Sequence, residues 1–242
     1  SVSAIARRQK TDSGTLRRYE TILPPGASVT YHLWADIFNG PWQAGLKLMF
    51  RDRYLCELNS FDETLYERDD LRWIRDSYLM ILQMAWDREF YDRFTGEPDF
   101  IRFLHKYDSI FSYVGVYGIW PTWPRLGLDE RNQWDLYRDL PGGLEWLREI
   151  SRQARSRGCR FFIAYNPWDK STREEAHLKG MAEIIAATEA DGVVLDTEGR
   201  SSAQLQQAAD TVRRGVVMYS EGMPVVSDMP GIIAARVHNA LY

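Results

Sequence analysis

Residues 191–220 read DGVVLDTEGRSSAQLQQAADTVRRGVVMYS, and this stretch decides the fold. Two short apolar runs, Gly192 to Asp196 and Gly215 to Ser220, enclose a polar segment in which Ser201 and Gln204 have the spacing of a helix cap. Short apolar runs bounded by polar residues are typical of buried strands. The stretch therefore predicts a strand, a helix and a second strand parallel to the first.

The same alternation continues in both directions from this unit. Further strands are predicted at 78–86, 110–120 and 159–165 and a sixth at 232–237, with helices at 98–107 and 141–158. Each strand ends in polar or aromatic residues, and no Gly-rich phosphate loop follows any of them. This pattern favours an α/β fold of the TIM (β/α)-barrel type. Six strands do not close an eight-stranded barrel, so we expect it to be incomplete at its C-terminal end.

The opening of the chain has a different pattern. Two short strands are predicted on either side of the turn Pro24-Pro-Gly-Ala, and a helix with Pro41 in its first turn follows. We therefore expect residues 1–39 to be the tail of a β-rich, sandwich-like unit, 40–70 a helical connector and 71–242 the barrel. The first residues, Ser1-Val-Ser-Ala, do not form a signal peptide. They look like a cut inside a longer protein with other domains.

Composition excludes several classes of function. The net charge of −4 over 242 residues gives no strong attraction to nucleic acid or anionic membrane. No apolar run approaches the roughly 20 residues of a membrane span. The four histidines are scattered and no dinucleotide or P-loop motif appears, so no metal and no cofactor are expected. Cys56 and Cys159 are interpreted as buried free thiols.

Two acidic residues, Asp196 and Glu221, form the sharpest candidate pair. Each comes at the C-terminal end of a short apolar run. Neighbouring strands lie about 4.8 Å apart, so both side chains can reach the same rim. Carboxyl groups about 5–5.5 Å apart suit a retaining glycosidase, in which one attacks the sugar and the other gives and recovers a proton. Glu198 is an alternative to Glu221 as the residue that gives and recovers the proton. A purely structural alternative is that these acids only cap the following helices.

Other polar and aromatic residues are predicted at the same rim. Asp87, Asn166 and Asp169 follow the first and third predicted strands, where they would bind sugar hydroxyl groups. Tryptophan rings can stack on the apolar face of a pyranose, and four lie at or just beyond strand ends: Trp86, Trp120, Trp123 and Trp168. They could equally be core residues, because tryptophan is highly buried on average. The long loop from Trp120 to Asp135 is either functional or a structural lid.

The stretch from Tyr78 to Tyr242 resembles the catalytic barrels of α-glycoside hydrolases, the broad group that holds α-amylases and α-galactosidases. The resemblance rests on the strand Asp191-Gly-Val-Val-Leu-Asp196 and on the loop Tyr165-Asn-Pro-Trp-Asp169. The chain also resembles uncharacterised bacterial hydrolase-like domains of larger multidomain proteins. Its β-rich opening before a Trp-containing connector resembles α-galactosidase-like layouts.

The resemblance implies roles for the pair. The nucleophile of these families is an Asp that ends the fourth strand, which corresponds to Asp196. In α-amylase-like enzymes a Glu ending the fifth strand is the acid/base, which corresponds to Glu221; in α-galactosidase-like enzymes Glu221 would bind substrate instead. The Arg that stands two residues before the nucleophile in α-amylases is Val194 here.

The sequence thus predicts a glycoside hydrolase-like domain that cleaves an α-linked sugar by a retaining mechanism. The alternative is a non-catalytic carbohydrate-binding or structural barrel domain of a larger protein. The expected partner is a carbohydrate rather than nucleic acid or membrane, and a periplasmic or secreted location would follow from a carbohydrate substrate.

Overall fold

The structure of the chain is a computed structural model. It describes residues 2–8, 25–28, 31–52, 60–85, 87, 90–92, 94–121, 129–169, 173–196, 203–222 and 226–235. The described residues form two compact units, one up to Phe61 and the other from Asp62 onward.

The first unit is a two-stranded antiparallel sheet with one helix. Strands β1 (Val2–Arg8) and β2 (Tyr31–Ile37) pair antiparallel, and helix α1 (Trp42–Asp52) packs against both. The predicted strand at 19–23 and Cys56 lie outside the described residues. The expected boundaries at 39/40 and 70/71 stay a prediction.

The second unit is built on one parallel sheet of six strands. Its order is β10–β9–β8–β7–β6–β3, so every strand lies beside its neighbour in the series. The bounds are Met80–Met84 for β3, Val116–Trp120 for β6, Arg160–Tyr165 for β7, Gly192–Leu195 for β8, Val217–Ser220 for β9 and Ala234–Ala235 for β10. This order has no reversal point, which distinguishes it from a doubly wound sheet. The predicted α/β fold with parallel strands is confirmed.

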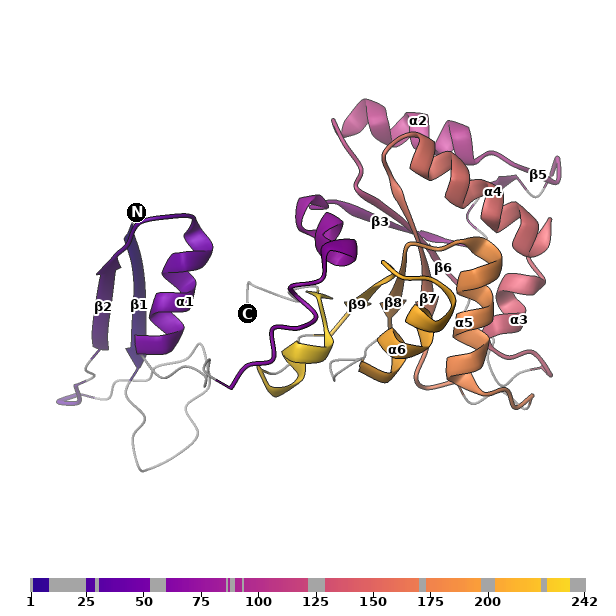
Figure 1. Ribbon diagram of the computed structural model, residues 1–242. Coiled ribbons are helices and arrows are strands. Elements are labelled where there is room, and N and C mark those ends of the chain that lie inside the picture. The colour runs from indigo at the N-terminus through magenta and orange to yellow at the C-terminus, as the bar shows by residue number, and fades with distance from the viewer. Residues whose placement is uncertain are drawn as a thin grey trace. The chain divides into compact units, whose positions relative to one another are not determined.

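Helices cover the outer face of this sheet (Figure 1). They are α2 (Phe100–Ile110), α4 (Gly143–Ser156), α5 (His177–Thr188) and α6 (Ala203–Val212). Alternate residues of each strand, such as Tyr117, Phe161 and Val193, point into the core beneath these helices. Right-handed crossovers in a sheet wound in one direction place all helices on one face.

The inner face of the sheet carries a second, smaller core. Val116, Phe162, Val194 and Val217 point to it, and the 3-10 helix η1 (Asp69–Asp76) packs there through the fully buried Leu71. Trp73 of η1 meets Phe162 edge to face, and its ring also carries the guanidinium of Arg160 at 5.0 Å from the centroid. The 3-10 helix η1, which precedes β3, thus packs on the inner face of the sheet.

The sheet curls, so that its two edge strands approach one space. Met80 of β3 and Ala234 of β10 line the same pocket, which has a volume of about 600 Å³. The described strands therefore form a curled half-barrel.

The structure corrects several local predictions. Ser171 and Glu174 have the spacing of a helix cap, but α5 begins only at His177, and Ala176 before it makes no side-chain cap. Within the predicted loop 120–135 begins an unpredicted helix, α3 (Gln133–Arg138). The short strands β4 (Tyr91–Asp92) and β5 (Glu97–Pro98) and the 3-10 helix η3 (Val226–Gly231) were also not predicted.

Candidate functional site

The backbone ladder brings Asp196 and Glu221 side by side. Leu195 of β8 pairs with Ser220 of β9, and each acid is the next residue of its strand. The Asp196 N–H donates to the Tyr165 carbonyl at 2.9 Å, and the Glu221 N–H donates to the Leu195 carbonyl at 3.1 Å. Both acids therefore continue the sheet by one residue at its C-terminal edge.

Alternation along each strand sets the direction of the two acids. Gly192 and Val194 face the inner side of the sheet, as do Val217 and Tyr219. Because side chains alternate, Asp196 and Glu221 continue the inward-facing series. Their side chains are close enough that Glu221 contributes to the raised pKa of Asp196.

The environment favours a proton on this pair. Burial, the hydrogen bond to Glu221 and the charge of Glu221 together raise the pKa of Asp196 from 3.8 to about 7. Carboxyl groups in contact resist losing their last proton, because two adjacent negative charges repel. Near neutral pH Asp196 is therefore partly protonated, whereas an ordinary aspartate is ionised.

Retaining glycosidases hold their two carboxyls roughly 5–5.5 Å apart and inverting ones roughly 6.5–9.5 Å apart. The pairing of Leu195 with Ser220 places Asp196 and Glu221 at the ends of neighbouring strands, which lie about 4.8 Å apart.

The remaining predicted residues lie around the rim in different ways. Trp120 ends β6 and packs on the inner core, on the face to which Asp196 and Glu221 point. Asp87 follows β3, and its charge adds to burial, the main cause of the raised pKa of Tyr117 in the outer core. The other three, Trp86, Trp123 and Glu198, lie outside the described residues.

The loop after β7 contains the three other predicted site residues. Asn166 is buried, and its Oδ1 accepts a hydrogen bond from the Trp168 N–H at 2.7 Å. The indole of Trp168 is 67% exposed. Asp169 accepts a hydrogen bond from the Gln133 N–H at 3.0 Å. These contacts tie the loop to α3.

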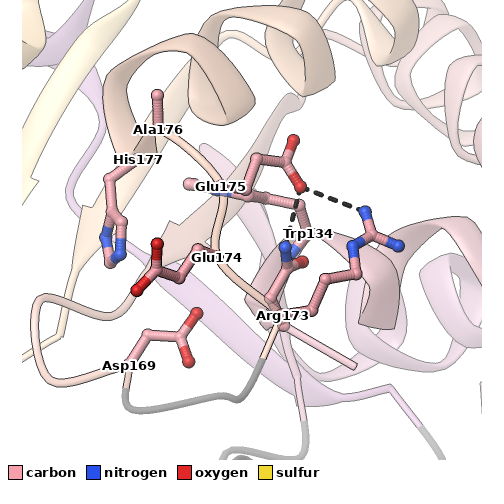
Figure 2. Close-up of a pocket in the computed structure, with 8 residues that line it drawn as sticks. Trp134, Asp169, Arg173, Glu174, Glu175, Ala176 and His177 are labelled. Carbon is pink, nitrogen blue, oxygen red and sulfur yellow. Dashed lines mark hydrogen bonds and ion pairs between the residues drawn. The ribbon is translucent and has the colours of Figure 1, made fainter. Parts of the chain in front are cut away.

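Asp169 also lines a polar pocket of about 540 Å³ beside the start of α5. Figure 2 shows the side chain of Glu174 extending toward His177 and the Glu175 carboxylate bonded to Arg173. Arg138 and Asn132 also bond Glu175, and Arg138 is the largest cause that lowers the pKa of Glu175 to about 2. Asp196 and Glu221 are not among the residues that line this pocket.

Sequence reasoning missed Gln133 and Tyr137 of α3, which bond the backbone of β7. The sequence contained a local signal for the start of α3. Asn132 and Asp135 form a capping box at the start of α3, a spacing that predicts a helix rather than a loop.

The described residues contain neither a cluster of metal ligands nor a membrane-spanning helix. Among them no group of three or more His, Cys, Asp or Glu side chains is arranged to hold a metal ion. Nor does any helix within the described ranges have the length and apolar character needed to cross a membrane.

Comparison with known proteins gives only distant structural similarity. No family model matches the sequence. No curated protein matches it either. The α-N-acetylgalactosaminidase NagBb from Bifidobacterium bifidum, solved with GalNAc, is 15% identical; the match covers 86% of this chain and 44% of that one, with a TM-score of 0.47.

Two further solved structures belong to different classes of enzyme. The pullulanase SAP of GBS, in complex with maltotetraose, is 13% identical over 64% of this chain and 29% of that one, with a TM-score of 0.40. The YdjI aldolase from Escherichia coli K12 is 12% identical over 70% of this chain and 68% of that one, with a TM-score of 0.33. This chain spans less than half the length of the two glycoside hydrolases. Identities and TM-scores this low leave its function to be argued from its own residues.

Proposed function

We propose that this chain is a glycoside hydrolase-like domain that cleaves an α-linked sugar with Asp196 and Glu221. The observation that carries the proposal is the pairing of β8 with β9, which places Asp196 and Glu221 at adjacent strand ends, where burial and the neighbouring Glu221 raise the pKa of Asp196 to about 7. A retaining glycosidase needs one ionised and one protonated carboxyl at neutral pH.

Asp196 is the proposed nucleophile and Glu221 the proposed acid/base. These roles require Asp196 to be ionised and Glu221 to be protonated once the sugar is bound. An oxygen of Asp196 then attacks the anomeric carbon, the glycosidic C–O bond breaks and the leaving oxygen takes the proton from Glu221. Water next attacks the same carbon and gives a proton back to Glu221, which releases the sugar and restores the pair.

The rim residues complete the proposed substrate site. Trp120 faces the same side as the pair, and the β7 loop presents the exposed indole of Trp168 next to Asn166 and Asp169. Aromatic faces and amide or carboxylate groups together suit the two sides of a sugar ring. Asp87 and the three residues outside the described ranges, Trp86, Trp123 and Glu198, keep their proposed binding roles.

The architecture proposed for this site is a TIM-type barrel of which the six parallel strands are a part. The strand order without reversal and the curled sheet support it. We also propose the division into a β-rich tail at 1–39, a connector at 40–70 and the barrel at 71–242, within a longer multidomain protein.

Azide rescue separates the two roles. Wild type, Asp196→Ala and Glu221→Ala are assayed with 2,4-dinitrophenyl α-glycosides of glucose, galactose and N-acetylgalactosamine, with and without sodium azide. The Glu221 variant should keep turnover on these good leaving groups and form a glycosyl azide of retained configuration. The Asp196 variant should form an inverted azide or none. Undiminished hydrolysis by Asp196→Ala would remove it from the mechanism.

A second candidate function is sugar binding without turnover. It is favoured by Trp168, which is 67% exposed beside Asn166 and Asp169, whereas neither Asp196 nor Glu221 lines the polar pocket at Asp169. Calorimetric titration of the wild type with maltotetraose and N-acetylgalactosamine distinguishes the two functions. Binding with no hydrolysis of any glycoside in the panel supports this second function.

A further inference from the structure

The sheet splits between β6 and β7 at its C-terminal edge. The ladder between these strands ends at Gly118 and Phe162, although β6 continues beside β3 as far as Trp120. On its other side β7 continues beside β8 as far as Tyr165. In a parallel strand, residues 164 and 166 direct their backbone groups to the same side as residue 162, which is the side of the split.

Side chains of α3 take the place of the missing strand. The Tyr137 hydroxyl accepts a hydrogen bond from the Ala164 N–H at 2.7 Å and lies 3.0 Å from the Ala164 carbonyl, to which it donates. Gln133 accepts a hydrogen bond from the Asn166 N–H at 2.9 Å and donates to the Asn166 carbonyl at 3.0 Å. Both side chains are fully buried. Backbone groups that would be unsatisfied are thereby paired.

Gln133 makes further contacts that extend beyond the strand. Its backbone N–H donates to Asp169, and its amide nitrogen lies 3.3 Å from the Nδ1 atom of His177. The loop between Asn166 and Asp169 is therefore held by one residue at both of its ends.

The indole of Trp168 stands on this clamped loop. The backbone N–H of Trp168 donates to Asn166 Oδ1, while two-thirds of the residue is exposed. An exposed indole loses hydrophobic stabilisation that burial would provide. Because the loop backbone that carries the ring is fixed, less entropy is lost when the ring binds a ligand.

We infer that Gln133 is a positioning residue, which holds the β7 loop so that Trp168 presents its ring as a stacking surface for a sugar. This inference rests on the proposed function for the identity of the ligand. The hydrogen bonds of Gln133 to Asn166 and Asp169 are independent of that function. Gln133 acts through Asn166 and Asp169 rather than on the sugar.

The first arm of the test measures the position of Trp168 without any sugar. The full chain is labelled with 5-fluorotryptophan, and the Trp168 resonance in the ¹⁹F NMR spectrum is identified from its loss in Trp168→Phe. In Gln133→Met, a substitution of similar volume, this resonance should move and sharpen toward that of a mobile indole. Gln133→Glu keeps the acceptor for the Asn166 N–H and should give a smaller change, which keeps the test available if Gln133→Met does not fold.

Gln206→Met is the matched control for this arm. Gln206 is also a buried glutamine, and it donates from a helix to the carbonyl of Val216, the residue before β9, at 3.0 Å. Its loss should lower the melting temperature comparably and leave the Trp168 resonance in place. A Trp168 resonance that stays unchanged in folded Gln133→Met would overturn the inference.

The second arm measures kinetics with the glycoside of the panel that the wild type hydrolyses fastest. Gln133→Met and Trp168→Ala should each raise KM roughly tenfold with kcat within about threefold, since one stacking contact is lost. The double variant should show no further rise, because both changes remove the same contact. Equal KM in Gln133→Met and wild type contradicts the stacking role. If the wild type hydrolyses nothing, the proposed function fails while the first arm still decides the clamp.

Discussion

The two halves of the C-terminal rim are built differently. Between β8 and β9 the ladder is regular up to its last pair, and the next residues, Asp196 and Glu221, meet. Between β6 and β7 the ladder stops at Phe162, and side chains of α3 replace the absent strand. The regular half places two carboxyls at adjacent strand ends. In the irregular half Gln133 bonds the β7 loop, on which Trp168 is exposed.

The difference shows that regular pairing suits groups that must touch. Two strand-end side chains in register are fixed by the backbone alone and need no helper. A loop that has to present a ring at a distance needs side chains from another element. In this chain Gln133 and Tyr137 supply them, and both must be buried for their hydrogen bonds to be strong.

The largest effect is expected at Gly192, the first residue of β8, where the sheet has no spare volume. A Cβ added at Gly192 would lie 2.3 Å from the Phe162 ring, so Gly192→Ala should destabilise the second unit by about 3 kcal/mol or more. At Gly118, beside the split, the added Cβ would lie 2.6 Å from the flexible end of Leu82. Gly118→Ala should therefore cost less, about 1 kcal/mol. Chemical denaturation of both variants checks this order, and equal losses would contradict it.

The next effect concerns two fully buried tyrosines. The Tyr137 hydroxyl bonds both backbone groups of Ala164, so Tyr137→Phe should destabilise by about 1–3 kcal/mol. The Tyr117 hydroxyl has no hydrogen-bond partner among the described residues. Tyr117→Phe should hence be neutral or slightly stabilising, because an unsatisfied buried hydroxyl is removed. Thermal unfolding of the two variants is the measurement, and a comparable loss in both would show that the α3 contacts contribute little.

The smallest effect is on the pH dependence of stability. Because the folded-state pKa of Asp196 is about 7 against 3.8 ordinarily, the folded chain keeps a proton between these values that the unfolded chain has released. The stability that this proton contributes is complete below about pH 4 and is lost as pH rises through 7. Asp196→Asn cannot ionise. It should melt higher than wild type at pH 8, by roughly 3–6 °C, and equally near pH 4.

An exposed carboxylate provides the control for this prediction. Asp69 pairs with Arg72 on the surface, and its side chain is 86% exposed. Asp69→Asn should therefore follow the pH profile of the wild type. A profile of Asp196→Asn that is parallel to wild type from pH 4 to 8 would show that Asp196 titrates normally.

The sequence alone predicted the regular half of the rim well. The strand order and the meeting of Asp196 with Glu221 follow from short apolar runs with a polar residue directly after each, because parallel pairing carries adjacent strand ends to one edge. The irregular half was not predicted. Tyr137 and Gln133 bond residues 27 and 33 positions away, and such contacts leave no trace in local periodicity.

The start of α5 at His177 also depends on contacts between distant parts of the chain. The local spacing of Ser171 and Glu174 suits a cap, but Glu175 is held by Arg138 and Asn132 of the α3 region. These tertiary bonds hold the segment just before α5, and the helix starts at His177 instead. The packing of η1 on the inner face was likewise missed, since a short 3-10 helix lacks a strong periodic signal.

The most direct test of the account is a ¹³C NMR titration of the side-chain carboxyl carbons, with the two resonances identified from Asp196→Asn and Glu221→Gln. If the pair shares one proton, both carbons should respond to the same two steps, one of them near pH 7, and each substitution should abolish the upper step in the partner. Two independent single titrations near pH 4 would mean that the carboxyls do not share a proton, and the proposed chemistry would lose its basis.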